Sequence, residues 1–178
     1  MKSSNLYNPF TKIAGFKSFI IGLTGLLITS YLAFLTGTHF NGLLNIDFAK
    51  DADYWVFLTE NLSNWLLMSI FMYASGLMLS KSKIRIVDIL GTTLLSRIPL
   101  VIAPLFRILP VFQSFVFQSW EMYFIIGFYL VSLIWTIILF FNAFKISCNL
   151  KNEKLIVSFI VSILLSEICT KLILKIVI

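Results

Sequence analysis

The sequence predicts an all-α integral membrane protein whose single domain, residues 1–178, is a bundle of five transmembrane helices. Three observations predict this fold class: hydrophobic residues make up 59% of the chain, charged residues only 12%, and the mean hydropathy is +0.96. Soluble proteins are rarely so apolar or so poor in charge. Aromatic residues, at 16%, fit the same class because their rings fill helix bundles and settle at membrane interfaces.

Five apolar runs of span length define the expected helices. We place them at residues 18–35, 64–79, 84–109, 122–141 and 155–175. Residues 1–17 form a short cytoplasmic or interfacial segment, since they are polar and interrupted by Asn8-Pro9. The first apolar run is not followed by a small-residue cleavage site, so we expect it to remain as a helix.

The distribution of Lys and Arg predicts the orientation. With the amino end in the cytoplasm, nine of these residues lie on the cytoplasmic side and four on the opposite side. Positive residues favour the cytoplasmic side, so the amino end is expected inside and the carboxyl end outside. The nine are Lys2, Lys12, Lys17, Lys81, Lys83, Arg85, Lys145, Lys151 and Lys154, and the four are Lys50, Arg107, Lys171 and Lys175.

Small residues recur at helical spacing in the first and fifth spans. Ser18, Gly22, Gly25 and Thr29 fall on one stripe of the first span. Such a stripe lets a neighbouring helix approach closely. Ser158, Ser162 and Ser166 form a similar stripe in the fifth span.

The connection between the first two spans, residues 37–61, is acidic. It holds one histidine and four carboxylates: His39, Asp47, Asp51, Asp53 and Glu60. A divalent-cation site is one interpretation, but the regular oxygen-ligand spacing of an EF-hand loop is missing. We therefore expect a solvated extracytoplasmic loop and no metal site.

The sequence lacks the common catalytic constellations. It contains no GxxxxGK[ST], HExxH or GxSxG pattern and only one histidine. Cys148 and Cys169 are solitary and lack CxxC spacing, so neither a zinc site nor a redox pair is indicated. The basic residues flank apolar runs instead of forming a nucleic-acid-binding patch. We expect a non-enzymatic protein without a cofactor or a nucleic-acid partner.

The third predicted span is unusual because it carries charges and prolines, which are avoided in transmembrane helices that contact only lipid. Arg85, Asp88, Thr92 and Ser96 step by three, four and four residues and draw one polar stripe. The stripe either packs against polar groups of other spans or lines a crevice open to the cytoplasm. We interpret this span as the inner wall of the bundle. The predicted intramembrane polar cluster is Arg85, Asp88, Thr92, Ser96, Arg97 and Glu167.

Arg97 and Glu167 are predicted to lie at similar depth. Each follows the start of its outward-running span by thirteen residues, which is roughly 20 Å and close to the bilayer centre. Because an unpaired charge there is costly, we expect the two to face each other or a shared polar cavity. Alternatively, Arg97 binds backbone carbonyls freed by Pro99 and Pro104, and Glu167 pairs with Lys171.

Several segments together resemble the Yip1-domain membrane proteins, especially their compact bacterial members. These segments are NPFTKIAGF near the amino end, IRIVDILGTTLLSRIPL in the third span and NAFKISCNLKNEKLIVSF after the fourth. The resemblance implies a multi-pass protein of the bacterial cytoplasmic membrane, with an ABC-type exporter as one partner class. The Rab GTPase binding of eukaryotic relatives uses long amino-terminal regions, whereas about seventeen residues precede the first span here, so we do not expect it.

Two functions are compatible with these features. The first is an accessory or scaffold protein that binds a membrane partner or organises membrane lipids. The second is a small transporter that uses the polar interior around Arg85, Asp88, Arg97 and Glu167. A continuous polar cavity that reaches one membrane face favours transport, whereas a closed interior with an exposed apolar groove favours the scaffold.

Overall fold

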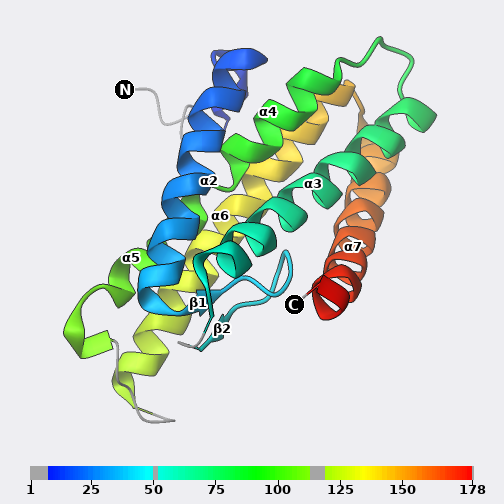
Figure 1. Ribbon diagram of the computed structural model, residues 1–178. Helices are drawn as coiled ribbons and strands as arrows, with labels where there is room; N and C mark the ends of the chain where they lie inside the picture. The colour runs from blue at the N-terminus through cyan, green and yellow to red at the C-terminus, as the bar shows by residue number, and fades with distance from the viewer. Residues whose placement is uncertain (1–7, 50–51, 113–118, 178) are drawn as a thin grey trace.

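The computed structural model describes residues 8–49, 52–112 and 119–177 and shows a helical bundle (Figure 1). Within these residues, five helical segments are long and apolar enough to span a membrane. They are α2 (Phe16–Thr36), α3 (Tyr54–Leu79), the third span (Ile86–Arg107), α6 (Trp120–Cys148) and α7 (Asn152–Val177). The predicted five-helix, all-α fold class is confirmed, and it suggests a multi-pass membrane protein.

The third span is three short helices in a row, whereas the sequence predicted one continuous span over residues 84–109. Its parts are α4 (Ile86–Ser96), the 3-10 helix η2 (Ile98–Val101) and α5 (Ile102–Arg107). Pro99 accounts for the interruption, because a proline ring has no N–H and clashes with the preceding helical turn. The chain continues through tighter bonds, such as that from Leu100 N–H to the Arg97 carbonyl at 3.0 Å.

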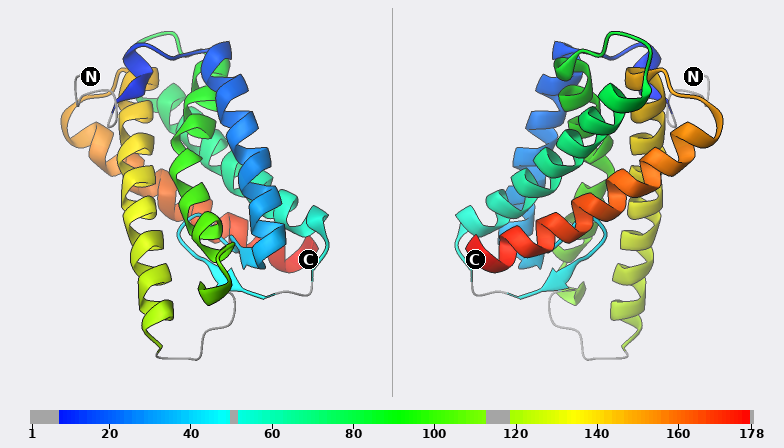
Figure 2. Two further views of the ribbon diagram at one scale, coloured as in Figure 1. Left: turned by 90° about the vertical axis from the view of Figure 1, so that its left-hand side faces the viewer. Right: turned by 90° about the vertical axis from the view of Figure 1, so that its right-hand side faces the viewer.

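The third span forms the inner wall of the bundle, as predicted. Of its most apolar 18-residue window, 61% is buried, against 33% in each of the other four spans. α4 packs against α2, α3 and α6, while α7 packs mainly against α3. Figure 2 shows the third span enclosed between α2 and α6. Arg97 and Arg107 and the two prolines, Pro99 and Pro104, are therefore removed from the lipid-facing surface.

α2 and α4 approach each other closely through glycine. A Cβ atom on Gly22 would lie 2.5 Å from Leu94 Cβ, and one on Gly91 would lie 2.5 Å from Ser18 Oγ. Neither position has room for a side chain. The small-residue stripe predicted in the first span thus forms the contact with the inner wall.

Three helix ends differ from the predicted spans by three residues or more. α3 begins at Tyr54, ten residues before the predicted residue 64, and so includes Glu60. α6 continues to Cys148, beyond the predicted residue 141, and α7 begins at Asn152. Hydropathy missed these turns because they carry polar residues. Those of α3 are buried and hydrogen-bonded, whereas those at the start of α7 are exposed.

Short elements complete the chain. η1 (Pro9–Thr11) precedes α2, and η3 (Pro110–Phe112) follows α5. Strands β1 (Thr38–His39) and β2 (Asp47–Phe48) pair antiparallel between α2 and α3. η1 and the last turn of α7 lie at opposite ends of the bundle (Figure 2). Residues 1–7 of the predicted interfacial segment lie outside the described residues, and the inside–outside orientation stays a prediction.

Adding one methyl group to Gly22 should destabilise the protein, whereas adding one to Gly127 should not. Gly22→Ala forces α2 away from Leu94 and should cost about 1–3 kcal/mol. Gly127 on α6 has nothing within 4 Å of its Cβ position, so Gly127→Ala should stabilise the helix by about 0.5–1 kcal/mol. Thermal unfolding in detergent measures both effects. Equal melting temperatures would contradict the close packing of α2 on α4.

Candidate functional site

The predicted polar stripe on α4 is a packing surface in the structure. Arg85 is exposed at the start of α4, whereas Thr92 and Ser96 are buried. Thr92 Oγ1 donates to the Asp88 carbonyl at 2.7 Å, and Ser96 Oγ donates to the Thr92 carbonyl at 2.7 Å. Thr92 Oγ1 also lies 3.3 Å from Ser147 Oγ on α6. These hydroxyls are satisfied inside the protein, mostly by their own helix.

Arg97 and Glu167 do not pair directly, and Glu167 makes the alternative contact that the sequence allowed, with Lys171. Arg97 is only 4% exposed, and its Nη2 donates to Asn61 Oδ1 on α3 at 3.0 Å. Glu167 pairs with Lys171 one turn along α7, with 2.8 Å between Lys171 Nζ and Glu167 Oε1. Within the described residues, no ion pair joins Arg97 to Glu167. An amide oxygen, supplied by the unpredicted polar turn of α3, takes the place of the expected carboxylate.

The connection between α2 and α3 enters the bundle, so the prediction of a solvated loop is wrong for its first half. Thr38, Phe40, Gly42 and Leu43 are all buried. Leu43 belongs to the same core cluster as Met68 of α3 and other residues of α4, α6 and α7. We call residues 37–49 the inserted loop. Irregular backbone at membrane depth requires protein partners for its N–H and C=O groups.

Two side chains of α3 bind both backbone polar groups of Phe40. Glu60 Oε2 accepts from Phe40 N–H at 2.8 Å, and Asn64 Nδ2 donates to the Phe40 carbonyl at 2.8 Å. Glu60 and Asn64 lie four residues apart and therefore project from one face of the helix. We call this arrangement the Phe40 clamp. It gives the buried backbone the partners that a helix or sheet would otherwise supply.

His39 contacts the other oxygen of the Glu60 carboxylate. His39 Nδ1 lies 2.7 Å from Glu60 Oε1, within hydrogen-bond distance. The imidazole also lies over Phe57, with the ring centroids 4.3 Å apart. Glu60, only 1% exposed, thus has a hydrogen-bond partner on each oxygen. Its carboxylate anchors the inserted loop to α3.

Two further spans bind the inserted loop. Glu167 Oε2 of α7 accepts from Leu44 N–H at 2.9 Å, and a Cβ atom on Gly42 would lie 2.6 Å from Glu167 Oε1. Arg107 of α5 donates from Nη1 to the Gly37 carbonyl at 3.2 Å, and its Cζ lies 4.3 Å from the Phe48 ring centroid. α3, α5 and α7 therefore all hold the inserted loop in place.

The described acidic residues of this region are not gathered into a cluster, and Asp47 and Glu60 are hydrogen-bonded within the protein. In the described part of the chain, no group of three or more His, Cys, Asp or Glu side chains could hold a metal ion. Asp47 instead accepts from Asn41 Nδ2 at 2.7 Å, and Glu60 is committed to the clamp. Asp51 lies outside the described residues.

The sequence analysis did not predict that Glu60, Asn61 and Asn64 lie on one polar face of α3. Their spacing continues the helical period of α3 toward its amino end, and this spacing could have predicted the shared face. Asn61 binds Arg97, while Glu60 and Asn64 bind the inserted loop. The face thus links the inner wall to the loop.

Removing the clamp carboxylate should loosen the inserted loop. Glu60→Ala leaves Phe40 N–H and the His39 ring without their hydrogen-bond partner, at a cost of about 1–3 kcal/mol for each group. We expect a lower melting temperature in detergent and new protease cleavage within residues 41–49. Asp53→Asn is the control, because Asp53 is exposed and its side chain makes no capping bond at the start of α3. An unchanged cleavage pattern for Glu60→Ala would contradict the clamp.

Arg97 should be energetically coupled to Asn61 and not to Glu167. A double-mutant cycle with Asn61→Ala and Arg97→Met should give a coupling of about 1.5–3 kcal/mol, as expected for a hydrogen bond to a charged group. The matched cycle with Glu167→Gln should be additive within about 0.5 kcal/mol. Unfolding free energies of the single and double variants provide both values. Coupling of Arg97 to Glu167, together with additivity between Arg97 and Asn61, would instead support a direct Arg97–Glu167 pair.

Known proteins provide no functional assignment for this arrangement. No family model matches the chain, and no curated protein or solved structure matches it either. The functional argument therefore rests on the contacts and surfaces of the chain itself.

Proposed function

We propose that this protein is a non-enzymatic membrane scaffold that binds a transmembrane helix of a partner on the outer face of α6. The observation that carries the proposal is an open notch around Gly127. The notch is lined by Tyr123, Phe124, Gly127, Phe128 and Val131 and has a volume of 440 Å³. It faces outward in a helix that is otherwise long and apolar.

The closed interior supports a scaffold over a transporter. Arg97 and Glu60 are almost fully buried and are bound by neighbouring side chains. The inserted loop packs into the bundle between the spans, and α3, α5 and α7 hold it there. Of the four cavities described in this structure, two lie on outer helix surfaces, one lies beside the inserted loop and one lies between η1, the third span and α6. None of these four is lined by Arg85, Asp88, Arg97 or Glu167. A solute could pass along the polar residues only if the inserted loop moved out of the bundle.

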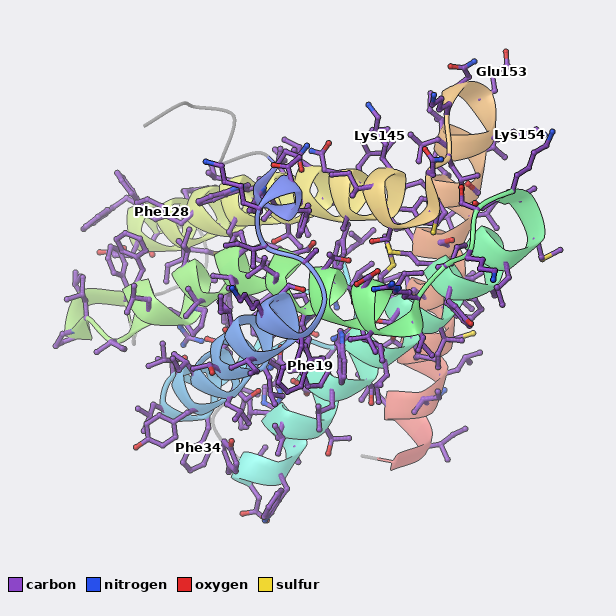
Figure 3. The ribbon with its side chains drawn as sticks, turned by 90° about the horizontal axis from the view of Figure 1, so that it is seen from above. Phe19, Phe34, Phe128, Lys145, Glu153 and Lys154 are labelled. Carbon is purple, nitrogen blue, oxygen red and sulfur yellow. The ribbon has the colours of Figure 1, made fainter. Side chains whose placement is uncertain are left out.

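The surroundings of Gly127 suit a partner helix. A glycine within a helix is unfavourable by about 0.5–1 kcal/mol relative to alanine, and no neighbour within this chain requires it. Small residues on a lipid-facing surface let a second helix approach closely. Phe128 beside the notch is fixed by stacking on Phe106 of α5, with ring centroids 3.9 Å apart (Figure 3). The notch therefore has a rigid aromatic wall.

Filling the notch should abolish partner binding without unfolding the protein. Gly127→Leu places a side chain in open space, so folded yield in detergent should match the wild type. The partner that co-purifies from mild detergent should be lost, because a leucine prevents close helix approach. Ile146→Phe is the matched control: it adds bulk to an exposed position of α6 outside the notch and off the face that carries Gly127. Equal partner recovery from Gly127→Leu and wild type would overturn the proposal.

The transporter alternative has one observation in its favour. Arg97 Nη1 is buried and has no hydrogen-bond partner among the described residues, so the guanidinium retains a donor for an anionic solute. Reconstituted protein should nevertheless show no anion flux above that of empty liposomes. Flux that disappears in Arg97→Met, with folding preserved, would contradict the scaffold and support transport.

A further inference from the structure

A second groove lies where the end of α3 meets the beginning of α7. Its volume is 480 Å³, within the range of about 300–1,000 Å³ typical of ligand sites. Met78 and Leu79 of α3 form one wall, and Val157 and Val161 of α7 form the other. From Lys154 to Val161 the groove follows two turns of α7, roughly 10 Å. This length suits the first part of an acyl chain.

The groove floor requires no polar ligand. Ser75 Oγ lies 3.0 Å from Ser162 Oγ, so the two hydroxyls satisfy each other across the α3–α7 contact. Ser158 Oγ donates to the carbonyls of its own helix at Lys154 and Leu155. With these hydroxyls committed, the wall offers an occupant mainly apolar surface. The Met78 side chain, 83% exposed, adds to that surface.

The mouth of the groove presents one positive and one negative side chain. Glu153 and Lys154 are adjacent in the first turn of α7, line the groove and are exposed. Neither forms an ion pair with any described residue. Figure 3 shows both at the edge of the molecule where α7 begins, with Lys154 extending beside the end of α3. The apolar span starts directly below them, at the depth where lipid headgroups lie.

This combination matches a zwitterionic lipid better than a protein helix. A helix would leave both charges without complementary groups unless it carried its own, whereas a phospholipid headgroup brings a phosphate and an amine to this depth. Lys154 suits the phosphate oxygens, and Glu153 suits an N–H donor. A primary ammonium has such donors and a quaternary choline has none. The pair of charges therefore selects for an aminophospholipid.

We propose that the α3–α7 groove is a selective site for phosphatidylethanolamine, with the phosphate bound by Lys154, the ammonium by Glu153 and an acyl chain along Val157 and Val161. The site is independent of the Gly127 notch, which lies on α6. Loss of partner binding in Gly127→Leu and loss of lipid selectivity here are therefore separate outcomes. All transmembrane surfaces contact lipid, and headgroup selectivity is what distinguishes this groove.

Lipid retention by the full chain tests the proposal. The protein is reconstituted in nanodiscs with equal amounts of phosphatidylethanolamine, phosphatidylcholine and phosphatidylglycerol, and retained lipids are counted by native mass spectrometry. Wild type should retain phosphatidylethanolamine preferentially. Lys154→Gln should lower its retention about five-fold, the effect expected of one basic residue at the membrane surface. Glu153→Gln should equalise retention of phosphatidylethanolamine and phosphatidylcholine.

Matched variants separate the groove from the general surface. Lys145→Gln removes an exposed lysine of α6 at the same end of the bundle and outside the groove, and it should retain wild-type selectivity. Val157→Trp should block the groove, whereas Ile156→Trp adds the same bulk to an exposed position beside it and should not. Circular dichroism and size exclusion confirm folding of each variant.

Three results would overturn the proposal. Equal retention of all three lipids by wild type would show that the groove has no selectivity. Equal retention of phosphatidylethanolamine and phosphatidylglycerol, unaffected by Glu153→Gln, would remove the role of the amine. Crosslinking of a photoreactive group at residue 157 to a protein helix in native membranes, in place of lipid, would assign the groove to a protein partner.

Discussion

The Phe40 clamp is the interaction on which the rest of the fold depends. Because Glu60 and Asn64 satisfy both backbone groups of Phe40, a loop whose only regular structure is the short β1–β2 pair can lie among the helices of the bundle. The loop in turn fills space that Leu43 shares with the main core cluster. Without the clamp, burying this backbone would leave polar groups unpaired in an apolar environment, at a cost of several kcal/mol. Enclosure of the polar interior follows from the same contacts.

The break in the third span has a related origin. Pro99 prevents α4 from continuing past Ser96, so Arg97 lies at a helix end and not within a continuous helix. Asn61 reaches it from α3. The turn of α3 that holds Asn61 also holds the clamp, and the inner wall and the inserted loop are therefore fixed by one short polar face. Close packing of α2 through Gly22 then covers the wall from the other side.

Composition and hydropathy were sufficient to predict five spans and a buried third span, because transmembrane segments must be apolar and charges within them must be internal. The small-residue stripe at Ser18 and Gly22 could also be predicted, because close contact between helices requires small side chains at helical spacing. The partners of Arg97 and Glu167 could not be predicted, since depth along a helix does not determine which way a side chain faces. Polar residues in 37–61 were predicted to be solvated, because hydropathy cannot distinguish an exposed polar loop from one whose polar groups are paired inside the protein.

The contact between Glu167 and the inserted loop has a consequence for assembly in the membrane. Leu44 is synthesised long before its acceptor, which lies 123 residues later in the chain. Until α7 enters the bilayer, this part of the loop lacks its final partner, and water is the only other source of hydrogen bonds. We therefore expect the inserted loop to reach its final position last, after α7 has docked on α3. Folding of the protein can be completed only once this final span is in place.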